Sequence, residues 1–329
     1  MREHLLLKGG TAINLTIFNL PRMSVVIDLD FVPNLTREET INERERLTKI
    51  LKGYMSEQGY SLSDASRFSH SLDAFHYNYV NAAGNRDMIK IEINYSLRTH
   101  VLLSEDRVFV TDAFGEPIKV RTVAAIEIFA AKTNALISRA AARDLYDICN
   151  MIDAKMFSGK KDMFRKFVVF YATISAKEVN KEFDTSAIDG LVISKIKSDL
   201  FPVLATKDKF DLEGKKQQAK DYIASIMKLT PQEADYMERF IAKEYRPELL
   251  FDDEEIKELK ELNKYPVDYS DIPETIDFSK AKFKYYKVTP KKEPITFRLD
   301  ADLIAVMKGT GKGYQTKVNK ILRDAFMGS

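Results

Sequence analysis

Two short segments near the N-terminus carry residue types that can bind a nucleoside triphosphate. The first is Lys8-Gly9-Gly10-Thr11, where a glycine pair ahead of a helix offers free backbone N–H groups to a phosphate. The second is the apolar segment Val25–Phe31, which carries Asp28 and Asp30. Residues two apart in a strand lie on one face, so these two carboxylates can share a divalent metal. Phosphates on the glycines and Mg²⁺ on the acids together imply a nucleotide triphosphate site.

A third carboxylate belongs with these two. Glu92 lies in Met88–Tyr95, where isoleucines alternate with polar residues as in a strand. We expect Glu92 to lie across the sheet from the aspartates, so the candidate metal ligands are Asp28, Asp30 and Glu92. The alternatives are a strand-end aspartate pair that faces solvent and an exposed Glu92.

Farther along the chain, positive charges recur with helical spacing. Lys132, Arg139, Arg143 and Asp147 are separated by seven, four and four residues, which places them near one face of an α-helix. Three cations and an acid suit gripping a triphosphate and stabilising the leaving group. The alternative is a solvated face with ordinary ion pairs. Asp144 is offset by about 100° from Arg143 and is not assigned to this face.

The candidate residues divide into two roles. The catalytic candidates are Asp28, Lys132, Arg143 and Asp147. The candidates for binding the nucleotide are Gly9, Gly10, Thr11, Ser24 and Arg139, and Lys8 is a weaker candidate for a phosphate contact.

The periodicity predicts an α+β fold, with a small mixed sheet flanked by helices, then a helical half and a separate tail. The chain has 329 residues, 45% of them hydrophobic, which is enough for a real core. The expected strands are Val25–Phe31, Ser66–Tyr79 and Met88–Tyr95. The expected helices are Thr36–Gln58, Val123–Ala135, Arg139–Met151, Lys161–Ile174, Lys215–Met227 and Pro231–Glu244. The expected domains are a core at 1–120, a helical domain at 121–250, an acidic linker at 251–279 and a tail at 280–329.

The net charge of +2 conceals a strong asymmetry. From residue 280 to the end there are 12 Lys and Arg against 4 Asp and Glu, a net charge of +8, whereas residues 251–277 carry a net charge of −7. Basic tails seek phosphate backbones. The alternative is that this tail folds back on the acidic segment.

The composition also bears on compartment. No apolar run is long enough to span a membrane, and the N-terminus lacks the apolar stretch of a signal peptide. Cys149 is the single cysteine, so an intrachain disulfide and a cysteine zinc cluster are excluded. We therefore expect a cytoplasmic protein without a membrane partner.

Four motifs carry a family resemblance. In order and spacing, the chain contains "LKGGTAINL", "LPRMSVVIDLDF", "IKIEI" and "SRAAARDLYDI", followed by "YRPELLFDD" at Tyr245–Asp253. Over about residues 1–263 it resembles the AbiEii/AbiGii-type nucleotidyltransferase toxins of toxin–antitoxin and abortive-infection systems. The resemblance implies transfer of a nucleoside monophosphate from an NTP to an acceptor, with tRNA or another RNA favoured, at a Mg²⁺ or Mn²⁺ site.

One position departs from the family pattern R-x-S-x-D-x-D. In that register the first aspartate falls at position 26, where this chain has Val26, and Asp28 takes the second place. A carboxylate displaced by two residues moves about 6–7 Å along the strand. We therefore expect impaired transfer, which Val26→Asp should restore. The alternative is a catalytically dead body carried by a DNA-binding, dimerising autorepressor.

The tail has its own resemblance. Residues 266–329 resemble BrnA-type ribbon-helix-helix antitoxins, with a strand at Ile295–Leu299 and helices at Asp300–Lys308 and Tyr314–Phe326. About 45 residues bury too little alone, so such a segment pairs strands in a homodimer. The candidate contacts to operator DNA are Thr296, Arg298 and Lys312. The alternative is a dimerisation module that does not bind DNA.

Overall fold

A computed structural model describes most of the chain. The described residues are 3–81, 84–96, 100–111, 117–175, 179–204 and 210–251, and, in the tail, 300–309, 311, 318, 319, 321, 322 and 325. The chain divides into two compact units, Met1–Asp271 and Ile272–Ser329.

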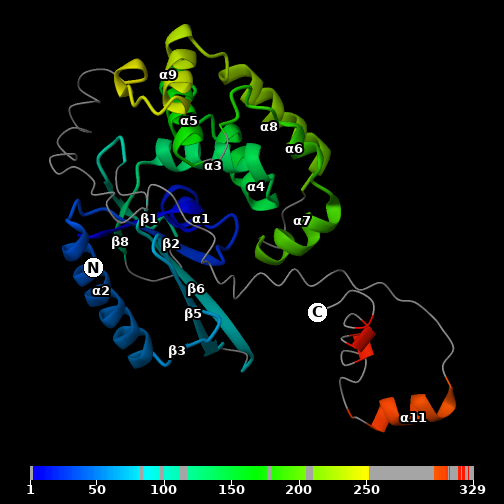
Figure 1. Ribbon diagram of the computed structural model, residues 1–329. Coiled ribbons are helices and arrows are strands. Elements are labelled where there is room, and N and C mark those ends of the chain that lie inside the picture. Colours follow the sequence, from blue (N-terminus) through cyan, green and yellow to red (C-terminus); the bar gives the residue numbers. More distant parts are fainter. Residues whose placement is uncertain are drawn as a thin grey trace. The chain divides into compact units, whose positions relative to one another are not determined.

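One mixed sheet forms the first half of the larger unit (Figure 1). Its strands are β1 (Leu5–Lys8), β2 (Val26–Phe31), β3 (Ser61–Leu62), β4 (Arg67–Phe68), β5 (Leu72–Val80), β6 (Arg86–Asn94), β7 (Glu105–Val108) and β8 (Lys119–Thr122). Their order is β3-β5-β6-β2-β1-β8-β7, with β4 also paired to β5. Strand β2 therefore lies between β1, to which it is antiparallel, and β6, to which it is parallel.

The remaining elements of this unit are mostly helices. They are α1 (Gly9–Ala12), the π-helical turn η1 (Ile13–Ile17), α2 (Arg37–Glu57), α3 (Ala125–Arg139), α4 (Ala142–Asp153), α5 (Lys161–Ser175), α6 (Ser186–Asp189), α7 (Ile193–Asp199), α8 (Leu212–Ile226) and α9 (Pro231–Ile241), with 3₁₀ turns at Phe201–Val203 and Pro247–Leu249. Helix α2 lies along the strands, whereas α3 to α9 gather on the side of the sheet where β8, β1 and α1 lie (Figure 1). This is the α+β arrangement that the sequence predicted.

Helix α2 begins at a capping box. The Thr36 side chain accepts a hydrogen bond from the backbone of Glu39, and the Glu39 side chain accepts one from the backbone of Thr36. The helix buries one apolar stripe, which includes Leu47 and Leu51, in a cluster with Phe75 and other residues of β5 and β6. This packing holds β5 and β6 in place beside β2.

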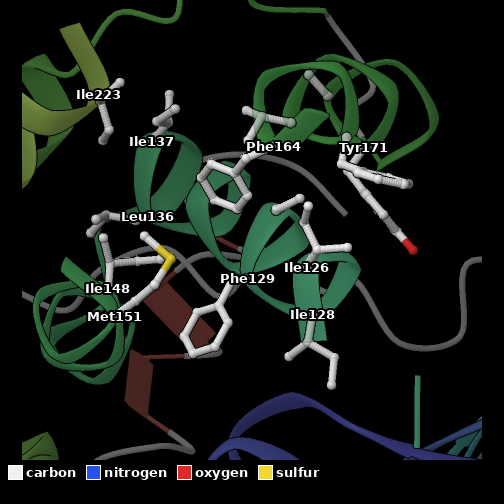
Figure 2. Close-up of a cluster of buried hydrophobic side chains, with 14 of the residues drawn as sticks. Ile126, Ile128, Phe129, Leu136, Ile137, Ile148, Met151, Phe164, Tyr171 and Ile223 are labelled. Carbon is white, nitrogen blue, oxygen red and sulfur yellow. The ribbon is translucent and has the colours of Figure 1, made fainter. Parts of the chain in front are cut away.

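A larger hydrophobic cluster joins the sheet to the helices. It includes Leu6 and Leu7 of β1 together with residues of α3, α4, α5, α8 and α9. Figure 2 shows Phe129 of α3 and Phe164 of α5 among these side chains, and both are fully buried. One hydrophobic core thus contains residues from both sides of position 120, where the sequence predicted a domain boundary. Both sides belong to the same compact unit, Met1–Asp271.

One expected strand is divided in the structure, and one helix boundary is shifted. The expected strand Ser66–Tyr79 is a hairpin of β4 and β5, since the backbone N–H of Ser69 donates to the carbonyl of Leu72 and turns the chain. The short, charged strands β7 and β8 were not expected. Helix α3 runs on to Arg139 and ends there, because Ala140 adopts a left-handed conformation with φ of 45°. Lys132 and Asp147 therefore lie on different helices, and the prediction of one shared helix face was wrong.

In the tail unit the structure describes α11 (Ala301–Gly309). Its bounds differ by one residue at each end from the first expected helix, Asp300–Lys308. The expected strand Ile295–Leu299, with Thr296 and Arg298, lies outside the described residues, as does Lys312. Across the described part of the whole chain, no helix has the length and apolar character needed to cross a membrane.

Candidate active site

A cavity of about 460 Å³ lies where β1 and β2 meet helices α3, α4 and α5. Its walls carry charged and polar side chains from six elements and from the loop that follows β6. The lining includes Lys8, Gly9, Gly10, Asp28, Asp30, Asn94, Ser96, His100, Glu127, Lys132, Arg139, Asp144 and Tyr171. Of the sequence-predicted site residues, Gly9, Gly10, Asp28, Asp30, Lys132 and Arg139 meet in this one cavity.

The glycine turn packs directly against the first aspartate. Lys8 pairs with Asp28 in the antiparallel register of β1 and β2, which places the following glycine beside that carboxylate. Gly9 has a φ of +63°, and a Cβ there would lie 2.5 Å from Asp28 Oδ2. A side chain at this position would thus be strained and would also displace the carboxylate. Glycine lets the turn and the acid share one end of the cavity.

Asp28 also faces another carboxylate across the sheet. Asp28 and Glu92 are directly opposite in the parallel register of β2 and β6, as the sequence predicted. Burial, followed by the negative charge of Glu92, raises the pKa of Asp28 to about 6. Glu92 is partly exposed, is paired with Lys90 Nζ at 2.5 Å, and lies outside the described lining of the cavity.

Asp30 is completely buried and is held by three neighbours. Lys8 Nζ lies 2.5 Å from its Oδ1, Asn94 Nδ2 donates to the same oxygen at 2.9 Å, and His100 Nε2 lies 3.3 Å from its Oδ2. Burial alone would raise the pKa of Asp30, but His100 and the charge of Lys8 outweigh it and hold that pKa below its usual value. Asp30 is therefore an anion fixed in the floor of the cavity.

A buried glutamate on α3 holds His100 beside Asp30. Glu127 accepts hydrogen bonds from the backbone N–H groups of Val101 and Leu102, and from the hydroxyl of Tyr171 at 2.8 Å. Burial would lower the pKa of His100, but its contacts with Asp30 and Glu127 raise it to about 9. His100, Glu127 and Tyr171 were not predicted from the sequence as site residues. An acid inside the apolar run "AAIEIFAAK" was the available signal.

Lys132 forms the centre of a charged cluster on the opposite wall. Its Nζ lies 2.8 Å from Asp144 Oδ1 and 2.9 Å from Asp147 Oδ2. Burial would lower the pKa of Lys132, but the carboxylates of Asp147 and Asp144 outweigh it and raise that pKa. Arg139 Nε donates to Asp144 Oδ2 at 3.1 Å, and its side chain is 68% exposed. Asp144, which the helical offset had set aside, therefore contacts both cations of this wall.

Other predicted residues lie behind or beside the cavity. The hydroxyls of Thr11 and Ser24 both donate to the backbone carbonyl of Val26, at 2.5 and 3.1 Å. Asp147 is buried against Arg22, and Arg143 is half-buried. Within the part of the chain that the structure describes, Thr11, Ser24, Val26, Arg143 and Asp147 are all outside the lining of the cavity.

The donor set suits a hard divalent cation. Carboxylate oxygens are the ligands that Mg²⁺ and Mn²⁺ prefer, and a cation would relieve the repulsion that raises the pKa of Asp28 beside Glu92. The described residues contain no group of three or more His, Cys, Asp or Glu side chains arranged to hold a metal. The case for a divalent cation therefore rests on the carboxylate chemistry of these residues and on the β2–β6 register, which places Asp28 opposite Glu92.

Comparisons with known proteins divide the chain in two. Residues 1–243 match the family described as the nucleotidyl transferase AbiEii toxin of a Type IV toxin–antitoxin system. Residues 236–326 match the BrnA antitoxin of a type II toxin–antitoxin system. No curated protein matches the chain.

The fold is also similar to a solved structure. MenT4, a nucleotidyltransferase toxin from Mycobacterium tuberculosis H37Rv, superposes with a TM-score of 0.53 and 17% sequence identity. The match covers 79% of this chain and 83% of MenT4. At this identity the similarity concerns the fold alone.

Proposed function

The chain belongs to the AbiEii family of nucleotidyltransferase toxins, and we propose that its cavity transfers a nucleoside monophosphate from an NTP to an RNA acceptor, with tRNA favoured. The observation that carries the proposal is the meeting of three features in one cavity. These are the Gly9-Gly10 turn, the acids Asp28 and Asp30, and the cations Lys132 and Arg139.

The chain's own residues divide the work. Backbone N–H groups of the glycine turn and the side chain of Lys8 receive phosphate oxygens at one end of the cavity. Lys132 and Arg139 offset the negative charge of the departing pyrophosphate, which is preorganised electrostatic stabilisation. Asp28 accepts a hydrogen bond from the attacking hydroxyl and orients it towards the α-phosphorus.

Asp28, Asp30 and Glu92 would hold Mg²⁺ or Mn²⁺. When bound, the ion supplies Lewis-acid stabilisation of the in-line displacement and neutralises phosphate charge. Lys8 and His100 keep Asp30 ionised and in place for this role.

The register of the acids changes the expectation for Val26. Asp28, and not Val26, packs against Gly9 and faces Glu92, and both Asp28 and Asp30 line the cavity. We propose that these two are the family's aspartate pair, with two additional residues between Ser24 and Asp28 compared with the family pattern. The chain is then an active enzyme, and Val26→Asp adds a charge outside the site.

Incorporation of label tests this function. The full chain is incubated with Mg²⁺, total RNA and each α-³²P-labelled NTP in turn. We expect the wild type to label RNA and Asp28→Asn to reduce labelling by at least about 10²-fold, the scale for loss of one preorganised group at a transferring phosphate. Val26→Asp should not increase labelling. A silent wild type that Val26→Asp activates would instead support the impaired register.

The tail supports a second, separate function. Its match to the BrnA antitoxin and its net charge of +8 favour a dimerising segment that binds operator DNA and represses its own expression. The contacts proposed for DNA are those of Thr296, Arg298 and Lys312. A gel-shift assay with the chain's own promoter separates this function from the transferase reaction.

A further inference from the structure

Arg22 lies behind the wall of the cavity and is almost completely buried, with 2% of its side chain exposed. Its Nε and Nη2 donate to the two oxygens of Asp147 at 2.7 and 2.5 Å, and its Nη1 donates to the carbonyl of Met23 at 2.9 Å. This fork geometry fixes both the guanidinium and the carboxylate. No substrate role follows directly, because Arg22 is outside the described lining of the cavity.

Asp147 connects Arg22 to the cavity. Its Oδ2 accepts a hydrogen bond from Arg22 Nη2 and lies 2.9 Å from Lys132 Nζ, so two cations share a single carboxylate. Without Arg22, Asp147 would have Lys132 as its remaining cation in this cluster. The ammonium group would then be drawn towards Asp147 and would be more fully neutralised. With Arg22 in place, part of the charge of Lys132 stays available to a phosphate.

Arg22 also packs beneath the glycine turn. A Cβ at Gly10 would lie 2.8 Å from Arg22 Nη2 and 3.3 Å from Ser24 Oγ. A side chain at Gly10 would therefore crowd the guanidinium, as one at Gly9 would crowd Asp28. One buried side chain touches both the phosphate-binding turn and the partner of Lys132.

We propose that Arg22 is a positioning residue for the transfer reaction, which fixes Asp147 and thereby sets the position and charge of Lys132 relative to the Gly9-Gly10 turn. This inference rests on the proposed function of the cavity. It assigns a role to a residue for which none was predicted from the sequence, and it explains why Asp147 is paired with two cations although it does not line the cavity.

The competing explanation is a buried ion pair that only stabilises the fold. Breaking such a pair lowers the stability of the protein, but it does not change the dissociation constant of the molecules that remain folded. The dissociation constant for a phosphate ligand therefore separates positioning from stability.

The binding probe is inorganic tripolyphosphate with Mg²⁺, titrated calorimetrically into the full chain. We expect Arg22→Lys, which keeps the charge and loses the fork, to weaken binding about tenfold, or 1.4 kcal/mol. Arg22→Gln, whose amide can still donate to Asp147, is the second variant if Arg22→Lys lowers the folded fraction. Thermal unfolding of each variant accompanies the titration.

The matched control is Arg165→Lys. Arg165 also pairs with a buried carboxylate: its Nε donates to both oxygens of Glu233, at 3.0 and 2.9 Å, and Arg165 is outside the described lining of the cavity. We expect this variant to lower the melting temperature and leave the dissociation constant for tripolyphosphate unchanged.

A double-mutant cycle completes the test. In a Lys132→Gln background, Arg22→Lys should have no further effect on binding, because Arg22 acts through Lys132. An additive effect in that background, or an unchanged dissociation constant in folded Arg22→Lys, overturns the inference alone. A wild type that binds neither tripolyphosphate nor any NTP overturns the proposed function and this inference with it.

Discussion

Asp28 on β2 and Glu92 on β6 are direct neighbours across two parallel strands, although they lie 64 positions apart in the sequence. Burial and this neighbouring charge raise the pKa of Asp28 to about 6. The two strands therefore bring together two acids that repel each other. A bound cation would offset this repulsion, and protonation of Asp28 would remove it by neutralising that carboxylate.

This relationship predicts a pH effect on stability. The pKa of Asp28 is higher in the folded protein than its ordinary value of 3.8. Between about pH 4 and 6 the folded state therefore holds a proton that the unfolded state has released, so the stabilisation from protonated Asp28 is lost as the pH rises through this window. Without divalent cations, thermal unfolding should show a steeper loss of melting temperature from pH 4 to 6 in the wild type than in Asp28→Asn.

The same pair predicts a response to metal. At pH 7, Mg²⁺ should raise the melting temperature of the wild type, since ligands that bind only the folded state stabilise it. Glu92→Gln and Asp28→Asn should each reduce that response. An equal Mg²⁺ shift in all three proteins would contradict binding at this pair.

The glycine turn gives a further prediction. Gly9→Ala should destabilise the protein by about 1–3 kcal/mol, because it combines a positive φ with a contact of 2.5 Å to Asp28 Oδ2. Gly53→Ala is the control: it lies within α2 with open space around it, and should stabilise the protein by about 0.5–1 kcal/mol. Urea unfolding measures both. A neutral Gly9→Ala would mean that the turn relaxes without cost.

Two arginines near the break between α3 and α4 give another prediction. Arg139 lines the cavity and contacts Asp144, whereas Arg143 is outside the described lining. Lys132→Ala and Arg139→Ala should lower RNA labelling, by up to about 10²–10³-fold for Lys132. Arg143→Ala should have a much smaller effect, in contrast to its expected catalytic role. Steady-state rates at matched melting temperatures provide the measurement, and an Arg143→Ala defect as large as that of Lys132→Ala would refute this assignment.

Local pattern predicted the parts of the site that lie close in sequence. The glycine pair, the two aspartates and the alternating strand with Glu92 are short-range signals, and the parallel register of β2 and β6 pairs Asp28 with Glu92 as expected. The pairing of Lys132 with Asp147 could not be obtained from a single helix face, because the left-handed Ala140 separates the two helices. The helices expected at Val123–Ala135 and Arg139–Met151 already implied a break before Arg139, and the structure places it after that residue.

Buried polar contacts were the least predictable feature. Arg22 and Asp147 lie 125 positions apart and meet only when the loop before β2 packs against α4. Likewise, Glu127, His100 and Tyr171 come from three separate segments and contact one another only in the folded protein. Such contacts depend on tertiary packing and not on local periodicity, so the sequence identified the ends of the cavity better than its supporting residues.

The shared core predicts that residues 1–120 do not fold alone. The cluster that contains Phe129 also contains Leu6 and Leu7, so a fragment ending at 120 would expose the apolar face of β1. Phe129→Ala should destabilise the larger unit by about 3–5 kcal/mol. Circular dichroism should show one transition that reports both sheet and helices, and two separate transitions would instead support independent domains.

The basic tail gives the last prediction. We expect the full chain to bind its own promoter DNA as a dimer, with an affinity that falls steeply as salt rises, because phosphate contacts release counterions. Arg298→Ala should weaken specific binding by about 1–3 kcal/mol for each base that the arginine reads, whereas Phe297→Asp should prevent dimerisation by placing a charge in the shared core. Asp28→Asn is the control, since it should abolish transfer and leave the DNA shift intact. Sedimentation and gel-shift assays at several salt concentrations test these outcomes. A monomeric chain, or a dimer that does not shift DNA at low salt, would favour the tail as a partner of the acidic segment 251–277.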